Sequence, residues 1–178
     1  EENILRARAV VFEGPEDYHN RLNDPKLNID EKTILFIRGV GCVGYPGSAE
    51  VVNMQPPDKL LKKGITHLPT VGDGRQSGTS ESPSILNASP ESVVGGGLAY
   101  LKTGDPVILD LNKGTLNADV DGKEWSNRIK KWKEPKIENQ TPWQEIYRTN
   151  VGQLADGGCL ELATAYKRIA KHLPRDNH

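Results

Sequence analysis

Two glycine-rich segments of the 178-residue sequence hold the side chains best suited to chemistry. The first covers residues 39–50 (GVGCVGYPGSAE) and ends on a single carboxylate, Glu50. Backbone rich in glycine lets N–H groups approach a ligand closely, and a carboxylate at its edge is a suitable ligand for a hard cation such as Mg²⁺. The alternative is that Glu50 begins a helix and meets its dipole. A Walker phosphate loop is excluded, because no Gly-Lys-Ser/Thr follows.

The second segment covers residues 72–84 (GDGRQSGTSESPS) and is dense in hydroxyls. Such a loop can bind a polyol or a phosphate through many short hydrogen bonds. Ser77 becomes a useful base only where a metal, a cation or N–H donors stabilise its alkoxide. Arg75 can supply that charge or hold a substrate carboxylate through two hydrogen bonds. The alternative is a surface loop in which Asp73 makes a turn and Arg75 has a structural ion pair. Ser77 lacks the Gly-x-Ser-x-Gly setting of a serine hydrolase.

The elements that must position these segments combine strands with helices. Apolar runs predict strands at 6–12, 33–37 and 64–69, and a hairpin at 106–111 and 115–120. Start and stop signals predict helices after Gly14, at 49–54 and 59–63, from Ser89 to the glycines at 95–97, at 125–132 and 143–147, and from Cys159 to Leu173. The set predicts an α+β fold, with a β-barrel-like core, peripheral helices and a helical C-terminal tail.

Composition excludes several classes of function. The net charge of −1 gives no bulk attraction to nucleic acid or to an acidic membrane, and no apolar run is long enough to span a bilayer. The two cysteines form no CxxC pair and the four histidines are scattered, so no Cys/His metal site is expected. Reduced cysteines favour a cytoplasmic or mitochondrial protein. The start at Glu1, without Met or a leader pattern, suggests a piece of a longer chain.

Two long motifs resemble a known family. VGYPGSAEVVNMQPP (43–57) and GDGRQSGTSESPSILNASPES (72–92) are similar to the C-terminal domain of the dihydroxy-acid and phosphogluconate dehydratases. The similarity extends from about Arg6 to about Val120. The QSGTS-x-SPSILNASPE version resembles the sugar-acid branch, such as xylonate and arabonate dehydratases, whereas branched-chain dihydroxy-acid dehydratases usually carry a DGRFSGGT-like version.

The resemblance implies a hydro-lyase with a core of the swivelling β/β/α type. Its members remove water from a 2,3-dihydroxy acid, here an aldonate that would become a 2-keto-3-deoxy acid. It implies an iron–sulfur cluster (2Fe-2S) acting as Lewis acid, and Mg²⁺ ligated by Glu50. Ser77 would be the base that removes the C2 proton, with Thr79 assisting it. Arg75 and Gln76 would bind the substrate.

Residues 1–122 are accordingly expected to form the barrel-like core and 123–178 a helical tail packed on it. The N-terminal domain that would ligate the cluster is absent from this sequence, so Cys42 is interpreted as a small buried residue, and the isolated piece is expected to be inactive. Expected partners are the sugar-acid substrate, the N-terminal domain of the same protein and further copies in a homo-oligomer, with no nucleic acid and no membrane. A branched-chain dihydroxy-acid dehydratase domain and a non-catalytic sugar- or phosphate-binding barrel remain the alternatives.

Overall fold

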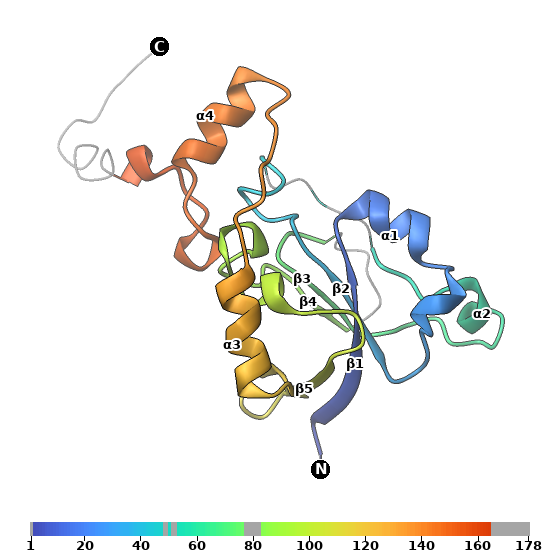
Figure 1. Ribbon diagram of the computed structural model, residues 1–178. Helices are drawn as coiled ribbons and strands as arrows, with labels where there is room; N and C mark the ends of the chain where they lie inside the picture. Colours follow the sequence, from blue (N-terminus) through green and yellow to red (C-terminus); the bar gives the residue numbers. More distant parts are fainter. Residues whose placement is uncertain (1, 48–49, 51–52, 77–82, 165–178) are drawn as a thin grey trace.

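The computed structural model describes residues 2–47, 50, 53–76 and 83–164 and has a curled, mixed sheet of six strands (Figure 1). The strand order is β4-β3-β2-β1-β5-β6. The strands are β1 Ile4–Phe12, β2 Thr33–Ile37, β3 Thr70–Gly72, β4 Ser84–Ile85, β5 Pro106–Asp110 and β6 Thr115–Ala118. The α-helices are α1 Pro15–Arg21, α2 Asp58–Leu61, α3 Gly122–Lys131 and α4 Pro142–Asn150, and the 3₁₀ turns are η1 Pro25–Leu27, η2 Ser92–Val94, η3 Gly97–Tyr100 and η4 Leu154–Asp156. The predicted α+β class with a barrel-like sheet is confirmed.

The centre of the sheet is the apolar pair β1 and β2. They run parallel, with Arg8 to Phe12 opposite Thr33 to Ile37, and all five residues of β2 are buried. On its other side β1 pairs with β5 in the antiparallel sense. Because side chains alternate along a strand, β1 and β2 each contribute to two hydrophobic clusters, one on each face of the sheet. Val10 and Phe12 pack with Leu35 and Ile37 in one cluster, and their neighbours in the chain pack in a second cluster on the opposite face.

The predicted strand at 64–69 is wrong, because pairing begins only at Thr70. Gly64 adopts φ +81°, and the Gly64 and Ile65 amides bond back to the carbonyls of Leu61 and Leu60. Those residues therefore finish the α2 turn instead of extending. The parallel ladder to β2 starts where the carbonyl of Pro69 accepts the Leu35 amide at 3.0 Å.

The helix predicted from Ser89 is reduced to the single 3₁₀ turn η2. Gly95, in the left-handed conformation with φ +84°, ends the turn after Val94. Glu91 belongs to the start signature from which this helix is predicted, and its carboxylate bonds to the amides of Val43 and Gly44. The helix predicted at 49–54 is not seen at the described residues of that range, 50, 53 and 54.

The chain after the sheet forms α3 and α4, as the sequence predicted, and residues 161–164 are helical. The rest of the helix predicted from Cys159 to Leu173 lies outside the described residues. Neither α3 nor α4 has a fully buried residue. In Figure 1, α3 lies beside the sheet and α4 stands apart from it, at the upper left. The tail is therefore placed by polar contacts together with a few apolar ones, such as the edge contacts of Trp125 and Trp132 with Tyr100.

One such contact joins α3 to the segment before β5. Arg128 donates to both carboxylate oxygens of Asp105, at 2.5 and 3.0 Å, and to the carbonyl of Tyr100. Both side chains of the pair are about nine-tenths buried, at 11% and 10% exposed. Burial alone would raise the pKa of Asp105, but the hydrogen bonds from Arg128 and from the Lys102 amide outweigh it, so the pKa lies below its ordinary value.

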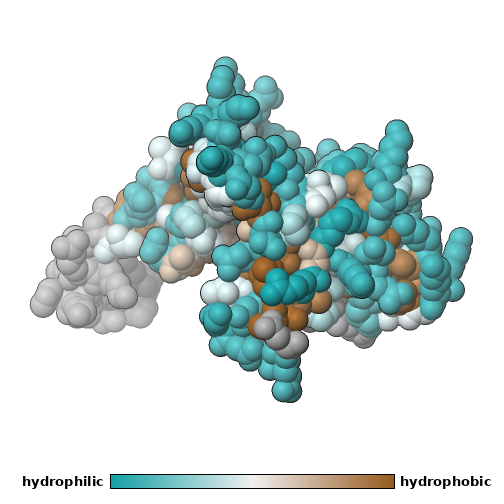
Figure 2. Space-filling view, turned by 60° about the horizontal axis from the view of Figure 1, so that its bottom comes forward, coloured by the Kyte–Doolittle hydropathy of each residue, from teal (hydrophilic) through white to brown (hydrophobic). Residues whose placement is uncertain are grey.

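The amino end of the sheet is open and apolar. A hollow of about 500 Å³ is lined mainly by apolar side chains of β1 to β5, among them Leu5, Ile34, Ile85 and Leu109. Figure 2, which brings the lower end of Figure 1 forward, shows apolar surface exposed among hydrophilic residues. Within the described ranges, no helix has the length and apolar character needed to cross a membrane.

The Asp105–Arg128 pair predicts a pH-dependent stability. A carboxyl whose pKa is lower in the folded state stabilises the fold above its unfolded pKa, about 3.9, and loses that contribution as the pH falls through the folded value. We therefore expect Asp105→Asn to destabilise the protein at pH 7, with the difference from wild type shrinking steadily below pH ~4. Urea unfolding of both proteins at a series of pH values measures this. A difference that stays constant down to pH ~2 would contradict the assignment.

Candidate functional site

The two glycine-rich segments lie side by side because they follow neighbouring parallel strands. β2 pairs with β3 through Leu35 to Ile37 opposite Thr70 to Gly72, so both strands release their loops at the same edge. In open sheets with parallel strands, this carboxyl edge is where ligands bind. The described parts of the two loops are residues 38–47 with Glu50, and residues 73–76.

Asp73 connects the two loops through buried hydrogen bonds. It is fully buried, and its carboxylate accepts four hydrogen bonds, from the amides of Gly39, Val40 and Ser92 and from the Ser92 hydroxyl, at 2.6–3.1 Å. All four donors are neutral. Because an isolated buried carboxylate is costly, this arrangement is stable only while the donors converge on it. Asp73 thereby fixes the first loop, the second loop and η2 relative to one another.

Glu91 also fixes the first loop, at residues that follow those bound by Asp73. It is 2% exposed, and its carboxylate accepts from the amides of Val43 and Gly44 and from the side chain of Gln153, each at 2.9 Å in its shortest contact. Asp73 and Glu91 therefore bind four amides of the first loop, those of residues 39, 40, 43 and 44. The backbone of the loop is built around two buried anions.

Two positions here must be glycine, because neighbouring atoms lie too close for a side chain. A Cβ on Gly74 would lie 2.1 Å from the carbonyl oxygen of Val40, and a Cβ on Gly41 would lie 2.5 Å from a carboxylate oxygen of Glu91. No larger residue fits without moving backbone or the buried carboxylate. The glycines that suggested a ligand-binding loop are needed here to let the loops pack on each other.

Glu50 and Arg75, the predicted metal ligand and substrate-binding residue, are brought together. Arg75 Nη2 lies 3.2 Å from Glu50 Oε1, and both side chains are about half exposed. The contact joins the two loops at the surface, above the buried carboxylates. Among the described residues no group of three or more His, Cys, Asp and Glu side chains is placed to hold a metal. Cys42 is buried, as predicted, and Cys159 is exposed.

Gln76 is buried at the start of the segment that carries the predicted base. Its Oε1 accepts from the Thr70 hydroxyl at 3.2 Å, while its Nε2 has no hydrogen-bond partner in the described part of the chain. A buried amide donor without a partner is uncommon in folded proteins, which makes Gln76 a candidate ligand contact. Ser77 and Thr79 lie outside the described residues, so their roles stay predictions.

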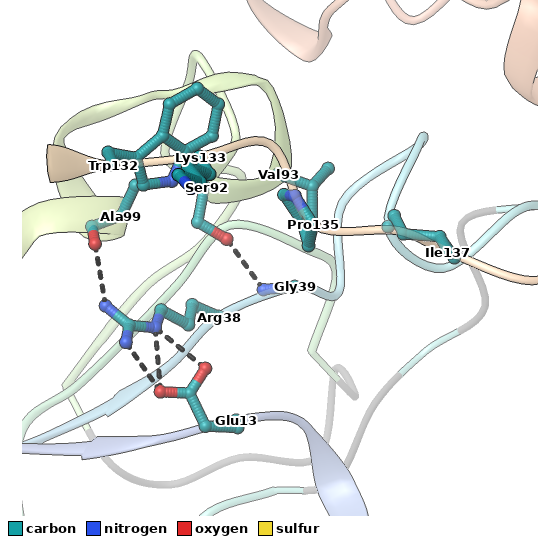
Figure 3. Close-up of a pocket in the computed structure, with 11 residues that line it drawn as sticks. Glu13, Arg38, Gly39, Ser92, Val93, Ala99, Trp132, Lys133, Pro135 and Ile137 are labelled. Atoms are coloured by element: carbon teal, nitrogen blue, oxygen red, sulfur yellow. Dashed lines mark hydrogen bonds and ion pairs between the residues drawn. The ribbon is translucent and has the colours of Figure 1, made fainter.

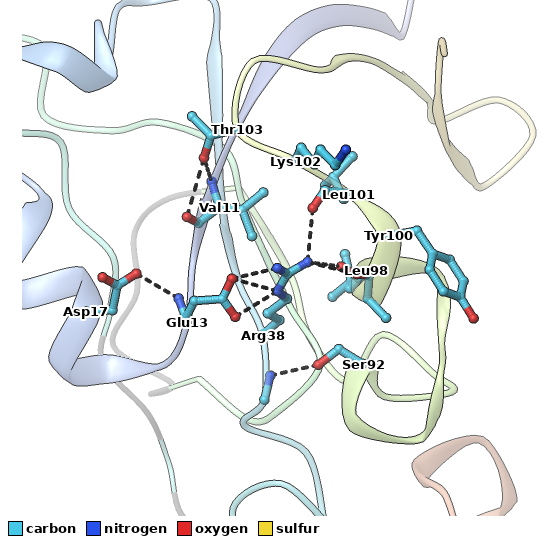
Figure 4. Close-up of polar contacts among 12 residues, drawn as sticks. Val11, Glu13, Asp17, Arg38, Ser92, Leu98, Tyr100, Leu101, Lys102 and Thr103 are labelled. Atoms are coloured by element: carbon cyan, nitrogen blue, oxygen red, sulfur yellow. Dashed lines mark hydrogen bonds and ion pairs between the residues drawn. The ribbon is translucent and has the colours of Figure 1, made fainter. Parts of the chain in front are cut away.

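Arg38, at the end of β2, lies in a neighbouring pocket of about 330 Å³ beside Trp132 and Lys133 of the tail (Figure 3). All three nitrogens of its guanidinium donate: to both oxygens of Glu13 and to the carbonyls of Leu98, Ala99 and Leu101 (Figure 4). These contacts connect the carboxyl ends of β1 and β2 to η3 and the residue after it. Arg38 therefore stabilises the frame of the site.

Sequence reasoning missed the structural importance of Asp73 and Glu91. Asp73 was weighed only as a turn residue, and Glu91 only as an acid at a helix start. The available signal was their position: each is an acid next to a segment rich in glycine and serine, with no basic residue at helical spacing to neutralise it. Such acids are candidates for binding backbone amides.

Comparisons with known proteins identify relatives of this chain. The family described as "Dihydroxy-acid/6-phosphogluconate dehydratase C-terminal" matches residues 1–159. D-xylonate dehydratase of Caulobacter vibrioides is 58% identical over 178 residues, covering 100% of this chain and 30% of that protein. L-arabinonate dehydratase of Rhizobium leguminosarum bv. trifolii is 44% identical over 129 residues (72% and 22%). Dihydroxy-acid dehydratase of Prochlorococcus marinus is 32% identical over 139 residues (78% and 24%).

The chain thus spans at most about a third of the length of these relatives. Identity is higher to the two sugar-acid dehydratases than to the dihydroxy-acid dehydratase, as the QSGTS motif predicted.

The Asp73 contacts predict a large loss of stability on truncation. Asp73→Ala leaves three amides and a hydroxyl without their acceptor, and we expect it to cost about 3–5 kcal/mol of unfolding free energy. Chemical denaturation measures the change. Asp119→Ala, at an exposed position after β6, is the matched control and should stay within about 0.5 kcal/mol of wild type. Equal effects of the two substitutions would disprove the role of Asp73.

Proposed function

Because the chain belongs to the dihydroxy-acid/6-phosphogluconate dehydratase C-terminal family, we propose that it is the C-terminal domain of a sugar-acid dehydratase. The reaction is removal of water from a 2,3-dihydroxy aldonate, and the enol that forms tautomerises to a 2-keto-3-deoxy acid. The 58% identity to D-xylonate dehydratase along all of this chain is the observation that carries the proposal. A pentonate is the substrate class we favour.

The residues of this chain would act from the two adjoining loops. Ser77 Oγ takes the proton from C2, Thr79 assists that serine, and the hydroxyl at C3 departs. Arg75 holds the substrate carboxylate through its fork of N–H donors, and the free Nε2 of buried Gln76 offers a further donor to a substrate oxygen. The negative charge that develops on the substrate thus lies beside a cation.

Glu50 fits one position of a Mg²⁺ site. Its carboxylate is half exposed at the end of the first loop, and its contact among the described residues is the half-exposed ion pair with Arg75, so exchanging Arg75 for a cation costs little. Bound Mg²⁺ would supply Lewis-acid stabilisation of the substrate's oxygens. With a cation at Glu50, Arg75 would pair with the substrate carboxylate.

The described residues do not fit an iron–sulfur cluster, since they offer no group of thiols. We propose that the cluster of the whole enzyme is ligated from the other two-thirds of a protein as long as its relatives. That part would also cover the apolar hollow at the amino end of the sheet. The swivelling β/β/α type, assembly as a homo-oligomer and a cytoplasmic or mitochondrial location stay predictions.

Turnover by the full-length protein tests the reaction. With cluster and Mg²⁺ reconstituted, we expect dehydration of a pentonate in preference to 2,3-dihydroxy-isovalerate. Ser77→Ala should bind the substrate but lower kcat at least about 100-fold, because general-base catalysis contributes about that much. Turnover of the branched-chain diol alone would move the protein to the dihydroxy-acid branch. A Ser77→Ala enzyme with most of its activity would exclude Ser77 as the base.

Arg75 allows substrate binding to be separated from folding. An exposed ion pair contributes about 1 kcal/mol or less, so Arg75→Ala should leave the unfolding midpoint nearly unchanged. The KM for the aldonate should rise about 10-fold or more, since a charged hydrogen-bonding partner of the carboxylate is lost. Steady-state kinetics with thermal unfolding measure both, and Lys59→Ala on α2 serves as the charge-matched control. An unchanged KM would show that the Glu50–Arg75 pair is purely structural.

A further inference from the structure

The tail is bound to the candidate site through one reciprocal pair of hydrogen bonds. Gln153 Nε2 donates to Glu91 Oε1 at 2.9 Å, and the Glu91 amide donates to Gln153 Oε1 at 2.8 Å. The two residues are 62 positions apart in the sequence. The side-chain amide of Gln153 is thus oriented uniquely, because each of its two ends meets a group of opposite kind.

The other side of the same carboxylate holds the first loop. Glu91 accepts from the amides of Val43 and Gly44. Arg148, also from the tail, donates from Nε to the carbonyl of Val43 at 2.8 Å. Val43 is therefore bound on both sides: Glu91 accepts from its amide, and Arg148 of α4 donates to its carbonyl. Seven residues later the loop reaches Glu50.

We infer that Glu91, oriented by Gln153, is a positioning residue: it fixes the conformation of the first loop and thereby the position of Glu50. Because Gln153 belongs to the tail, the tail then contributes to the function of the site. The inference rests on the proposed function for the role of Glu50. Glu91 is buried and its carboxylate is occupied by loop and tail donors. It therefore acts through the loop and not on the substrate.

The chemistry of the pair gives a sharp test, because the two residues are nearly isosteric. In Glu91→Gln the new amide nitrogen faces a donor, whichever way it or the amide of Gln153 is turned. In Gln153→Glu two carboxylates face each other. In the exchanged double variant, E91Q/Q153E, the new amide oxygen takes the place of Glu91 Oε2, where it accepts from Gly44 and from Val43, the latter at 3.1 Å. The new amide nitrogen takes the place of Oε1 and can donate to the carboxylate at position 153, which still accepts from the backbone amide of residue 91. Net charge and the hydrogen bonds between positions 91 and 153 are then restored, while the Val43 amide keeps one of its two acceptor oxygens.

The experiment uses the full-length protein and two readouts that need no turnover. Hydrogen exchange of peptides covering 39–47 reports the loop, and calorimetric titration with Mg²⁺ alone reports the metal site. Each single variant should speed exchange in that segment and weaken Mg²⁺ binding about 10- to 100-fold, the usual effect of losing a group that orients a ligand. The exchanged variant should return both towards wild type. Kinetics should show an increased Mg²⁺ requirement with a smaller change in kcat at saturating Mg²⁺.

Glu134→Gln and Gln140→Glu make the same chemical changes at exposed tail positions and should behave as wild type. Wild-type exchange and Mg²⁺ affinity in the single variants, or no recovery in the exchanged variant, would overturn the inference. If Glu91→Gln fails to fold, Gln153→Glu still tests the inference. If wild type dehydrates no aldonate while the exchange pattern is as expected, the positioning stands and the proposed function fails.

Discussion

The arrangement of the site depends on the burial of the Asp73 carboxylate. It is fully buried and bound by four neutral donors from two distant segments. A buried anion of this kind cannot lose a donor cheaply, because the desolvation cost remains when the hydrogen bond is gone. The loop after β2, the loop after β3 and η2 are therefore fixed together, and Gly74 must be glycine so that the loops can approach.

Burial divides the acids of this region into two kinds. Asp73 and Glu91 are held by backbone amides and form a frame whose geometry is set before any ligand arrives. Glu50 is half exposed and, within the described part of the chain, pairs with Arg75, in a contact that water and salt weaken. Such a pair can be exchanged for a cation or a substrate at little cost. A rigid backbone carrying replaceable surface charges suits binding that must be reversible in each turnover.

Local pattern was sufficient for β1, β2, the β5–β6 hairpin and the tail helices α3 and α4, because apolar period and capping residues determine them. It misplaced β3, since the register of a parallel strand is decided by its partner, here the Leu35 amide bonding to Pro69. The pairing of Glu50 with Arg75 follows from two loops sharing one edge, which strand order alone makes visible. The roles of Asp73 and Glu91 depend on amides 19 to 48 residues away, beyond the reach of any local signal.

The tail is placed by directional contacts, which explains why it can be coupled to the site. Its helices have no fully buried residue, and Trp143 of α4 is 78% exposed. Arg128, Arg148 and Gln153 instead bond to defined acceptors in the core. Coupling of this kind is reciprocal: if Gln153 helps to hold the first loop, any ligand that orders this loop must in equal measure favour the attached tail. Ligand binding at Glu50 and attachment of the tail are then thermodynamically coupled through Glu91.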